Sequence, residues 1–233
     1  MTAQRFKANS LRLAAALLIG IVLGLGGWFS LMVSHATEDG ARFASEYERG
    51  YEDGYTAHVW LQDKPVESSG IMPLYLQKDQ QWSETAYSAG TIGSYGCGLT
   101  AAAMAVCYLT TDHVTPKDLL SHVGSECLTD GVNDMSKFAS WLSEHYSGLA
   151  KLDTFWDIDD ALNRVDEGWL VFAGMGGRLG DRTYGSHVVL IWRSNSDGTY
   201  QIRDSDDGGN SIRAWSREEL KAVEWGSFNA IKA

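Results

Sequence analysis

A cysteine between two glycines, at the start of an apolar and alanine-rich run, most constrains how this chain can fold. Cys97 lies between Gly96 and Gly98, and the run at 101–106 predicts a buried helix. The glycines allow a tight backbone turn that leaves the thiol uncovered. At a helix N-terminus, unpaired N–H groups and the positive end of the dipole favour the thiolate. Since the thiolate is the nucleophilic form, the sequence predicts a reactive cysteine.

A histidine and an aspartate follow in positions that suit such a cysteine. His187 begins the apolar run 188–192, and Asp204 ends the extended segment 200–203. Taken alone, His187 could be a polar residue at a strand end, and Asp204 could be a turn residue. Their order, on a helix start and two neighbouring strands, predicts a papain-type Cys-His-Asp site.

The chain resembles a known family at these positions, the double-glycine leader peptidases that process bacteriocins, with their wider relatives in the papain-like clan. Residues 73–82 are similar to the opening strand and loop of that family, and residues 96–98 to its nucleophile motif. Residues 185–189 are similar to its histidine strand. The resemblance implies that Gln77 supplies an oxyanion donor and that Asp204 orients the imidazole.

The resemblance covers residues 71–233, with two departures. The family usually has proline after Cys-Gly, where this chain has Leu99. It often has Asp-Pro at the acid, and here Ser205 follows Asp204. Neither departure removes a reactive group, but both weaken the transfer of any particular substrate. The leader-peptide specificity is not carried over, because the resemblance does not extend to an ATP-binding cassette.

The resemblance implies a hydrolase, a cysteine peptidase that cleaves a peptide or protein substrate through a thioester. His187 would take the proton of Cys97, and Gln77 with the backbone N–H of Cys97 would bind the oxyanion. Two alternatives remain open: a cell-wall peptide amidase or transpeptidase of the same clan, and a non-catalytic peptide-binding module that retains the fold. Faster alkylation of Cys97 than of the other cysteines would favour an enzyme.

The N-terminus predicts a membrane anchor. Three basic residues precede an uncharged run from Leu13 to Val33, about the length a helix needs to cross a bilayer. Positive charge on this flank predicts a cytoplasmic N-terminus and a domain outside the cell, on a single-pass bacterial membrane protein. The alternative is a signal peptide cleaved after Ala36, which would release a secreted chain.

The net charge limits the partners of this chain. The sequence carries 30 acidic and 19 basic residues, a net charge of −11, and three of the basic residues precede the apolar run. The exported part is therefore still more acidic, which argues against nucleic acid and anionic lipid as partners. The sequence leaves the oligomeric state open.

The cysteine count and spacing do not indicate a metal or cofactor. Cys107 reads as a small buried residue of the Cys97 helix, and its pairing with Cys127 remains open. Zinc motifs of the Cys-x-x-Cys and His-Glu-x-x-His types are absent from the sequence. Residues 204–208 are faintly similar to a calcium loop, but a turn explains them better because the twelfth-position glutamate is missing.

The predicted organisation is a cytoplasmic tip and anchor at 1–36, a helical stalk at 37–70, and a cysteine-peptidase-like domain at 71–233. The domain is predicted to be α+β and papain-like, with a helical layer that carries the nucleophile packed on an antiparallel sheet. The glycine-rich segment 174–185 is expected to be a loop at the cleft rim. Beyond the Cys97 helix, further helices are predicted over 135–146, over 157–167, from Pro116 with Thr115 as its N-cap, and from Ser216 with Glu219 completing a capping box. Strands are predicted over 169–173, 187–192, 200–204 and 228–231.

Overall fold

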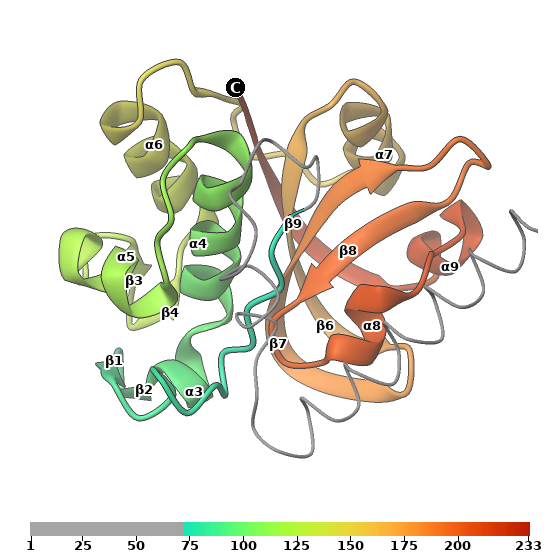
Figure 1. Ribbon diagram of the computed structural model, residues 1–233. Coiled ribbons are helices and arrows are strands. Elements are labelled where there is room, and N and C mark those ends of the chain that lie inside the picture. Colours follow the sequence, from blue (N-terminus) through green and yellow to red (C-terminus); the bar gives the residue numbers. More distant parts are fainter. Residues whose placement is uncertain (1–71) are drawn as a thin grey trace, which may run out of the picture. The chain divides into compact units, whose positions relative to one another are not determined.

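The computed structural model describes residues 72–233, which form a mixed α+β domain (Figure 1). The predicted anchor at 1–36 and the stalk at 37–70 lie outside the described residues. Between residues 72 and 233, no helix is long and apolar enough to cross a membrane. The α+β prediction is confirmed for the described part of the chain, and its antiparallel sheet fits a papain-like fold.

Seven helices and nine strands follow one another in the described residues. The helices are α3 (Ile92–Tyr95), α4 (Cys97–Leu109), α5 (Pro116–Val123), α6 (Met135–His145), α7 (Ile158–Asp166), α8 (Gly208–Ile212) and α9 (Arg217–Lys221). The strands are β1 (Ala86–Tyr87), β2 (Gly90–Thr91), β3 (Leu128–Thr129), β4 (Val132–Asn133), β5 (Ala150–Lys151), β6 (Leu170–Leu179), β7 (Arg182–Ser194), β8 (Tyr200–Asp204) and β9 (Glu224–Lys232).

The main sheet has five strands in the order β5-β9-β6-β7-β8, and all neighbours are antiparallel. Side chains along β6 and β7 alternate between its two faces, as the period of a strand requires. Val171, Ala173, Val189 and Ile191 belong to a core cluster that also contains buried residues of α7 and α9. Figure 1 shows α4, α5 and α6 on the other side of the sheet from α7 and α9.

Helix α4 is buried almost along its length, and this explains its composition. Residues Gly98 to Val106 are all buried, because the helix lies between the sheet and the helices α5 and α6. Small alanine side chains let neighbouring elements approach a helix from several directions. The alanine-rich run therefore places the start of α4 beside the sheet that carries His187.

Local capping signals in the sequence are confirmed. Thr115 caps α5 with Pro116 in its first turn, and Ser216 and Glu219 form a capping box at α9. Each cap involves residues within one turn, so the sequence pattern alone identifies it.

The expectation that 174–185 is a loop is wrong. β6 continues to Leu179 and β7 begins at Arg182, so the segment is a long hairpin with a register shift between Met175 and Gly177. The turn contains Gly180 at φ 60°, a conformation that favours glycine. Ladder hydrogen bonds join backbone groups, so a strand can form here without the apolar alternation that usually signals one.

Two smaller expectations also need correction. The segment similar to an opening strand has no ladder partner from Met72 to Leu76, and turns follow it. The acidic stretch after Asp204 was expected to be only a turn, yet it leads into α8, which Asp207 caps through the N–H groups of Gly209 and Asn210. Helix α8 has five residues, too few for a helical period to show in the sequence.

Candidate active site

Cys97 is the first residue of α4, and its free thiol is half-buried. The predicted tight turn does not explain the two flanking glycines. Gly96 has a φ of −86°, which any residue can adopt, and Gly98 lies inside the helix. A Cβ on Gly96 would lie 2.5 Å from the carbonyl oxygen of Ile92, and one on Gly98 would lie 2.7 Å from Cβ of Asn133. The glycines are therefore required by close packing on both sides of the cysteine.

His187 and Asp204 are within hydrogen-bonding distance, as the sequence predicted. Nε2 of His187 and Oδ1 of Asp204 are 2.8 Å apart, and both side chains are buried. The sheet register explains the contact, because Asp204 on β8 pairs with Val189 on β7, two residues from His187. Since Asp204 takes Nε2, Nδ1 is the ring nitrogen left to interact with Cys97, which also raises the pKa of His187.

The surroundings of His187 favour the charged imidazolium. Burial alone would lower its pKa, but hydrogen bonds with Asp204 and Cys97 and the charges of both residues raise the pKa to about 9. A histidine held between two acidic groups is protonated at neutral pH. The imidazole is therefore held as the charged partner of the Asp204 carboxylate.

Asp204 is fully buried and receives an unusually complete set of donors. Burial alone would raise its pKa, but hydrogen bonds from His187 and Asn210 and the positive charge of His187 lower it. A carboxylate with this many donors stays ionised and holds the imidazole in one orientation. The donors are Nε2 of His187, the hydroxyl of Tyr184, Nδ2 of Asn210, and the N–H groups of Asp206 and Asp207.

Tyr184 lies on the same strand as His187, β7, and covers the histidine ring. Its ring stacks on that of His187, with centroids 4.3 Å apart and an interplanar angle of 8°. Its hydroxyl donates to Oδ2 of Asp204 over 2.8 Å. Tyr184 therefore touches both members of the pair and shields them from water. This role could not be predicted from the sequence, because Tyr184 lies in the segment expected to be a loop.

Gln77 is buried and held in a defined orientation. Its backbone N–H donates to the carbonyl of Ser205 over 2.8 Å, and the hydroxyl of Ser205 donates to its Oε1 over 3.0 Å. One N–H of its Nε2 donates to the carbonyl of Gly93, which leaves the second N–H as a donor. Ser205, the departure from the family pattern, is thus the residue that orients the amide of Gln77.

The other two cysteines are free and differ from Cys97 in their surroundings. Cys107 is half-buried and shares contacts with the hydroxyl of Tyr75 and the backbone of Val114, so it is not the purely apolar residue expected. Burial raises its pKa. Burial also raises the pKa of Cys127 to about 12. The pairing left open by the sequence is not formed, and both thiols are held in their neutral form.

The acidic stretch after Asp204 is neutralised by neighbouring cations. Asp206 pairs with Lys78 at 2.5 Å, and Arg182 bridges Asp206 and Asp207. Over residues 72–233, no three His, Cys, Asp or Glu side chains are grouped to hold a metal ion. The backbone N–H groups of Asp206 and Asp207 also donate to Oδ1 of Asp204.

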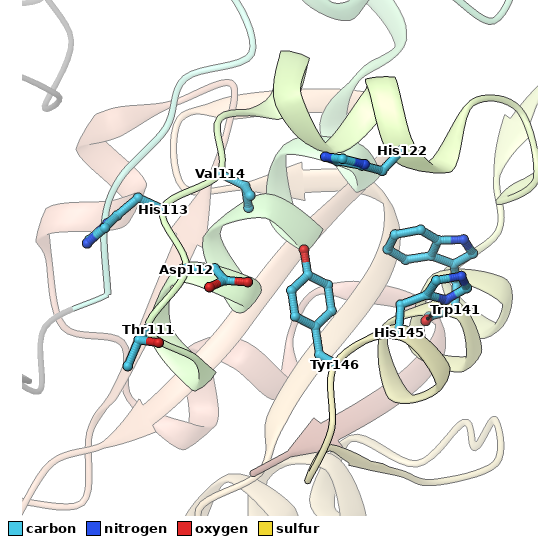
Figure 2. Close-up of a pocket in the computed structure, with 8 residues that line it drawn as sticks. All are labelled: Thr111, Asp112, His113, Val114, His122, Trp141, His145 and Tyr146. Carbon is cyan, nitrogen blue, oxygen red and sulfur yellow. Dashed lines mark hydrogen bonds between the residues drawn. The ribbon is translucent and has the colours of Figure 1, made fainter.

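A separate cavity lies at the far end of α4 from the thiol. It has a volume of about 590 Å³ and lies among the loop after α4, helix α5 and helix α6 (Figure 2). Trp141 and His145 stack within it, with ring centroids 4.0 Å apart. The cavity contains none of Cys97, His187, Asp204 and Gln77.

Sequence comparison gives one family. The Peptidase_C39 like family matches residues 72–232, which contain all four predicted site residues. A search of curated proteins found no match.

Comparison of structures gives weak similarity to two variants of the Salmonella effector SpvD. One is 16% identical, with 60% of this chain and 70% of that chain covered and a TM-score of 0.34. The other is 15% identical, with 74% and 80% covered and a TM-score of 0.32. At these scores the similarity contributes nothing further to the assignment.

Proposed function

Because the chain belongs to the Peptidase_C39 like family, we propose that it is a cysteine peptidase that hydrolyses peptide bonds with Cys97, His187 and Asp204. The observation that carries the proposal is the position of His187, whose Nε2 is hydrogen-bonded to Asp204 and whose pKa is raised by both Asp204 and Cys97. A nucleophile, a base and a group that orients the base are the three parts of a catalytic triad.

The first half of the reaction would form a thioester. His187 takes the proton of Cys97, and the thiolate attacks the carbonyl carbon of the scissile peptide bond. The tetrahedral intermediate collapses when the C–N bond breaks, and the imidazolium gives its proton to the leaving amine. Asp204 stays ionised and keeps the imidazole in place throughout, since five donors stabilise its charge.

The second half would release the acid product. His187 removes a proton from water, and the hydroxide attacks the thioester carbon. The C–S bond then breaks, the acid product leaves, and the imidazolium returns its proton to the sulfur of Cys97. The remaining N–H of Gln77 and the backbone N–H of Cys97 would donate to the oxyanion in both halves. A single donor of this kind typically contributes about 10²–10³ in turnover.

The test is hydrolysis of a peptide library by the full chain and its Cys97→Ala variant. Alanine is a good helix former, so this variant should keep the fold and lose turnover. Cys107→Ala is the matched control, because it removes a thiol from the same helix without touching His187. Turnover by a folded Cys97→Ala variant would refute the triad. If the protein cleaves peptidoglycan fragments but no library peptide, the alternative function of a cell-wall peptide amidase or transpeptidase would be favoured.

We also propose that the domain works outside the cell, anchored by residues 13–33. The length of that uncharged run and the basic residues before it support the proposal. The native protein should fractionate with membranes, and an external protease should digest the domain in intact cells. An intact mass that places the mature N-terminus at Thr37 would overturn the anchor in favour of a cleaved signal.

A further inference from the structure

The side chain of Asn133 touches the sulfur of Cys97 and lies outside the triad. Asn133 is the last residue of β4, which forms a small hairpin with β3 near the start of α4 (Figure 1). Its Nδ2 lies 3.7 Å from Sγ of Cys97, a hydrogen-bonding distance for sulfur. The same nitrogen donates to the carbonyl of Tyr95 over 2.7 Å. The hairpin therefore brings a polar donor to the nucleophile from the helical side of the domain.

Two hydrogen bonds determine which way the amide of Asn133 points. The hydroxyl of Tyr87 donates to Oδ1 over 2.7 Å, and one N–H of Nδ2 donates to the carbonyl of Tyr95. A reversed amide would place Oδ1 against that carbonyl oxygen, which is also an acceptor. The second N–H is therefore directed at Cys97.

The glycine after the cysteine is what allows this approach. A Cβ on Gly98 would lie 2.7 Å from Cβ and 2.8 Å from Cγ of Asn133. Real side-chain atoms do not come so close, so any larger residue at 98 would displace the amide. Gly98 of the Gly-Cys-Gly motif therefore leaves the space that the side chain of Asn133 occupies.

We propose that Asn133 is a further catalytic residue, which donates a hydrogen bond to the sulfur of Cys97 and stabilises the thiolate. The inference rests on the proposed function, because it takes Cys97 as the nucleophile. A hydrogen bond to the charged form of a group favours that form, and bonds to ions are stronger than bonds to neutral acceptors. When the proton moves from Cys97 to His187, Asn133 would stabilise the charge left on sulfur.

The test measures alkylation of the full chain by iodoacetamide between about pH 5 and pH 9, resolved for each cysteine by peptide mass spectrometry. The variants are Asn133→Ala and Asn133→Asp. Asp is isosteric and keeps the acceptor for Tyr87, but it replaces both N–H donors with a charge that repels the thiolate. Val132→Ala is the matched control, since Val132 is exposed on the same short strand.

Both Asn133 variants should shift the pH profile of the Cys97 alkylation rate upward by about one pH unit. At the low-pH end of the profile, this shift slows alkylation about tenfold. The rates of the variants should converge with that of the wild type at high pH, where the sulfur is ionised even without the hydrogen bond from Asn133. A purely structural loss would lower the rate at every pH. Val132→Ala should leave the Cys97 profile unchanged.

Two negative results are distinguishable. Wild-type rates of Cys97 no faster than those of Cys107 and Cys127 would refute the proposed function itself. A reactive Cys97 with the same pH profile in wild type, Asn133→Ala and Asn133→Asp would overturn the role of Asn133 alone. If Asn133→Ala fails to fold, the isosteric Asn133→Asp decides the question, and Tyr87→Phe offers a third variant in which the amide loses only its orienting bond.

Discussion

Replacing Gly98 with alanine should destabilise the domain, although the residue lies in a helix. At most helical positions this change is favourable by about 1 kcal/mol, because glycine is a poor helix former. Here the new methyl group would lie 2.7 Å from Cβ of Asn133 and 2.8 Å from Sδ of Met135. The outcome therefore depends on whether Asn133 can move.

The structure indicates that Asn133 moves only at a cost. Its amide has hydrogen bonds with Tyr87, Tyr95 and Cys97, and each is worth about 1 kcal/mol. Overpacking a tight contact costs about 1–3 kcal/mol. Together these exceed the helix gain, so the free energy of unfolding should fall by about 1–3 kcal/mol. For a domain of this size, the melting temperature should fall by about 2–10 °C.

The assay is chemical and thermal denaturation of the full chain, with Gly185→Ala as the control. Gly185 has open space where a Cβ would be and no positive φ, so its change should leave the free energy of unfolding nearly unaltered. Gly98→Ala should also slow the alkylation of Cys97, since it displaces the amide beside the sulfur. A Gly98→Ala variant as stable as the wild type, with unchanged alkylation, would refute the packing argument.

Two further predictions concern the His187 environment. Since its pKa is raised from the ordinary 6.5 to about 9, the stability from its charged form is complete below 6.5 and is lost as pH rises to about 9. The free energy of unfolding should fall by up to about 3 kcal/mol over that pH range. The His187→Gln variant should not show this fall, and an equal fall in the variant would contradict the prediction. Tyr184→Phe keeps the ring stacked on His187 but removes one donor to Asp204, so kcat should fall less than tenfold. Tyr184→Ala also removes the ring and should lower kcat further. Equal losses of kcat in the two variants would mean that the stacked ring contributes nothing.

Features that depend on neighbouring residues could be predicted from the sequence. The caps predicted at Thr115 and Ser216 are confirmed, because each involves a hydrogen bond within one turn. The apolar run after His187 and the extended segment before Asp204 are confirmed as strands, and their short hairpin makes them neighbours in the sheet. Their contact could be predicted because only a few residues separate the two strands.

The hairpin at 174–185 could not be predicted by the same means. Its strands are stabilised by backbone hydrogen bonds across the sheet, and β6 is also paired with β9 at the end of the chain. Glycine-rich sequence carries no alternation, so the local pattern indicates a loop. Tyr184 was missed as a partner of Asp204 for this reason.

The sequence by itself determined the place of Cys97 at a helix start, the strands that carry His187 and Asp204, and the order of the three residues. Only the tertiary structure decided which side chains contact Gln77 and Cys97. Ser205 reaches Gln77 across 128 positions of the chain, and Asn133 reaches Cys97 across 36. Such contacts depend on how packed elements bring distant segments together, and hydrogen bonds between side chains leave no periodic trace in a single sequence.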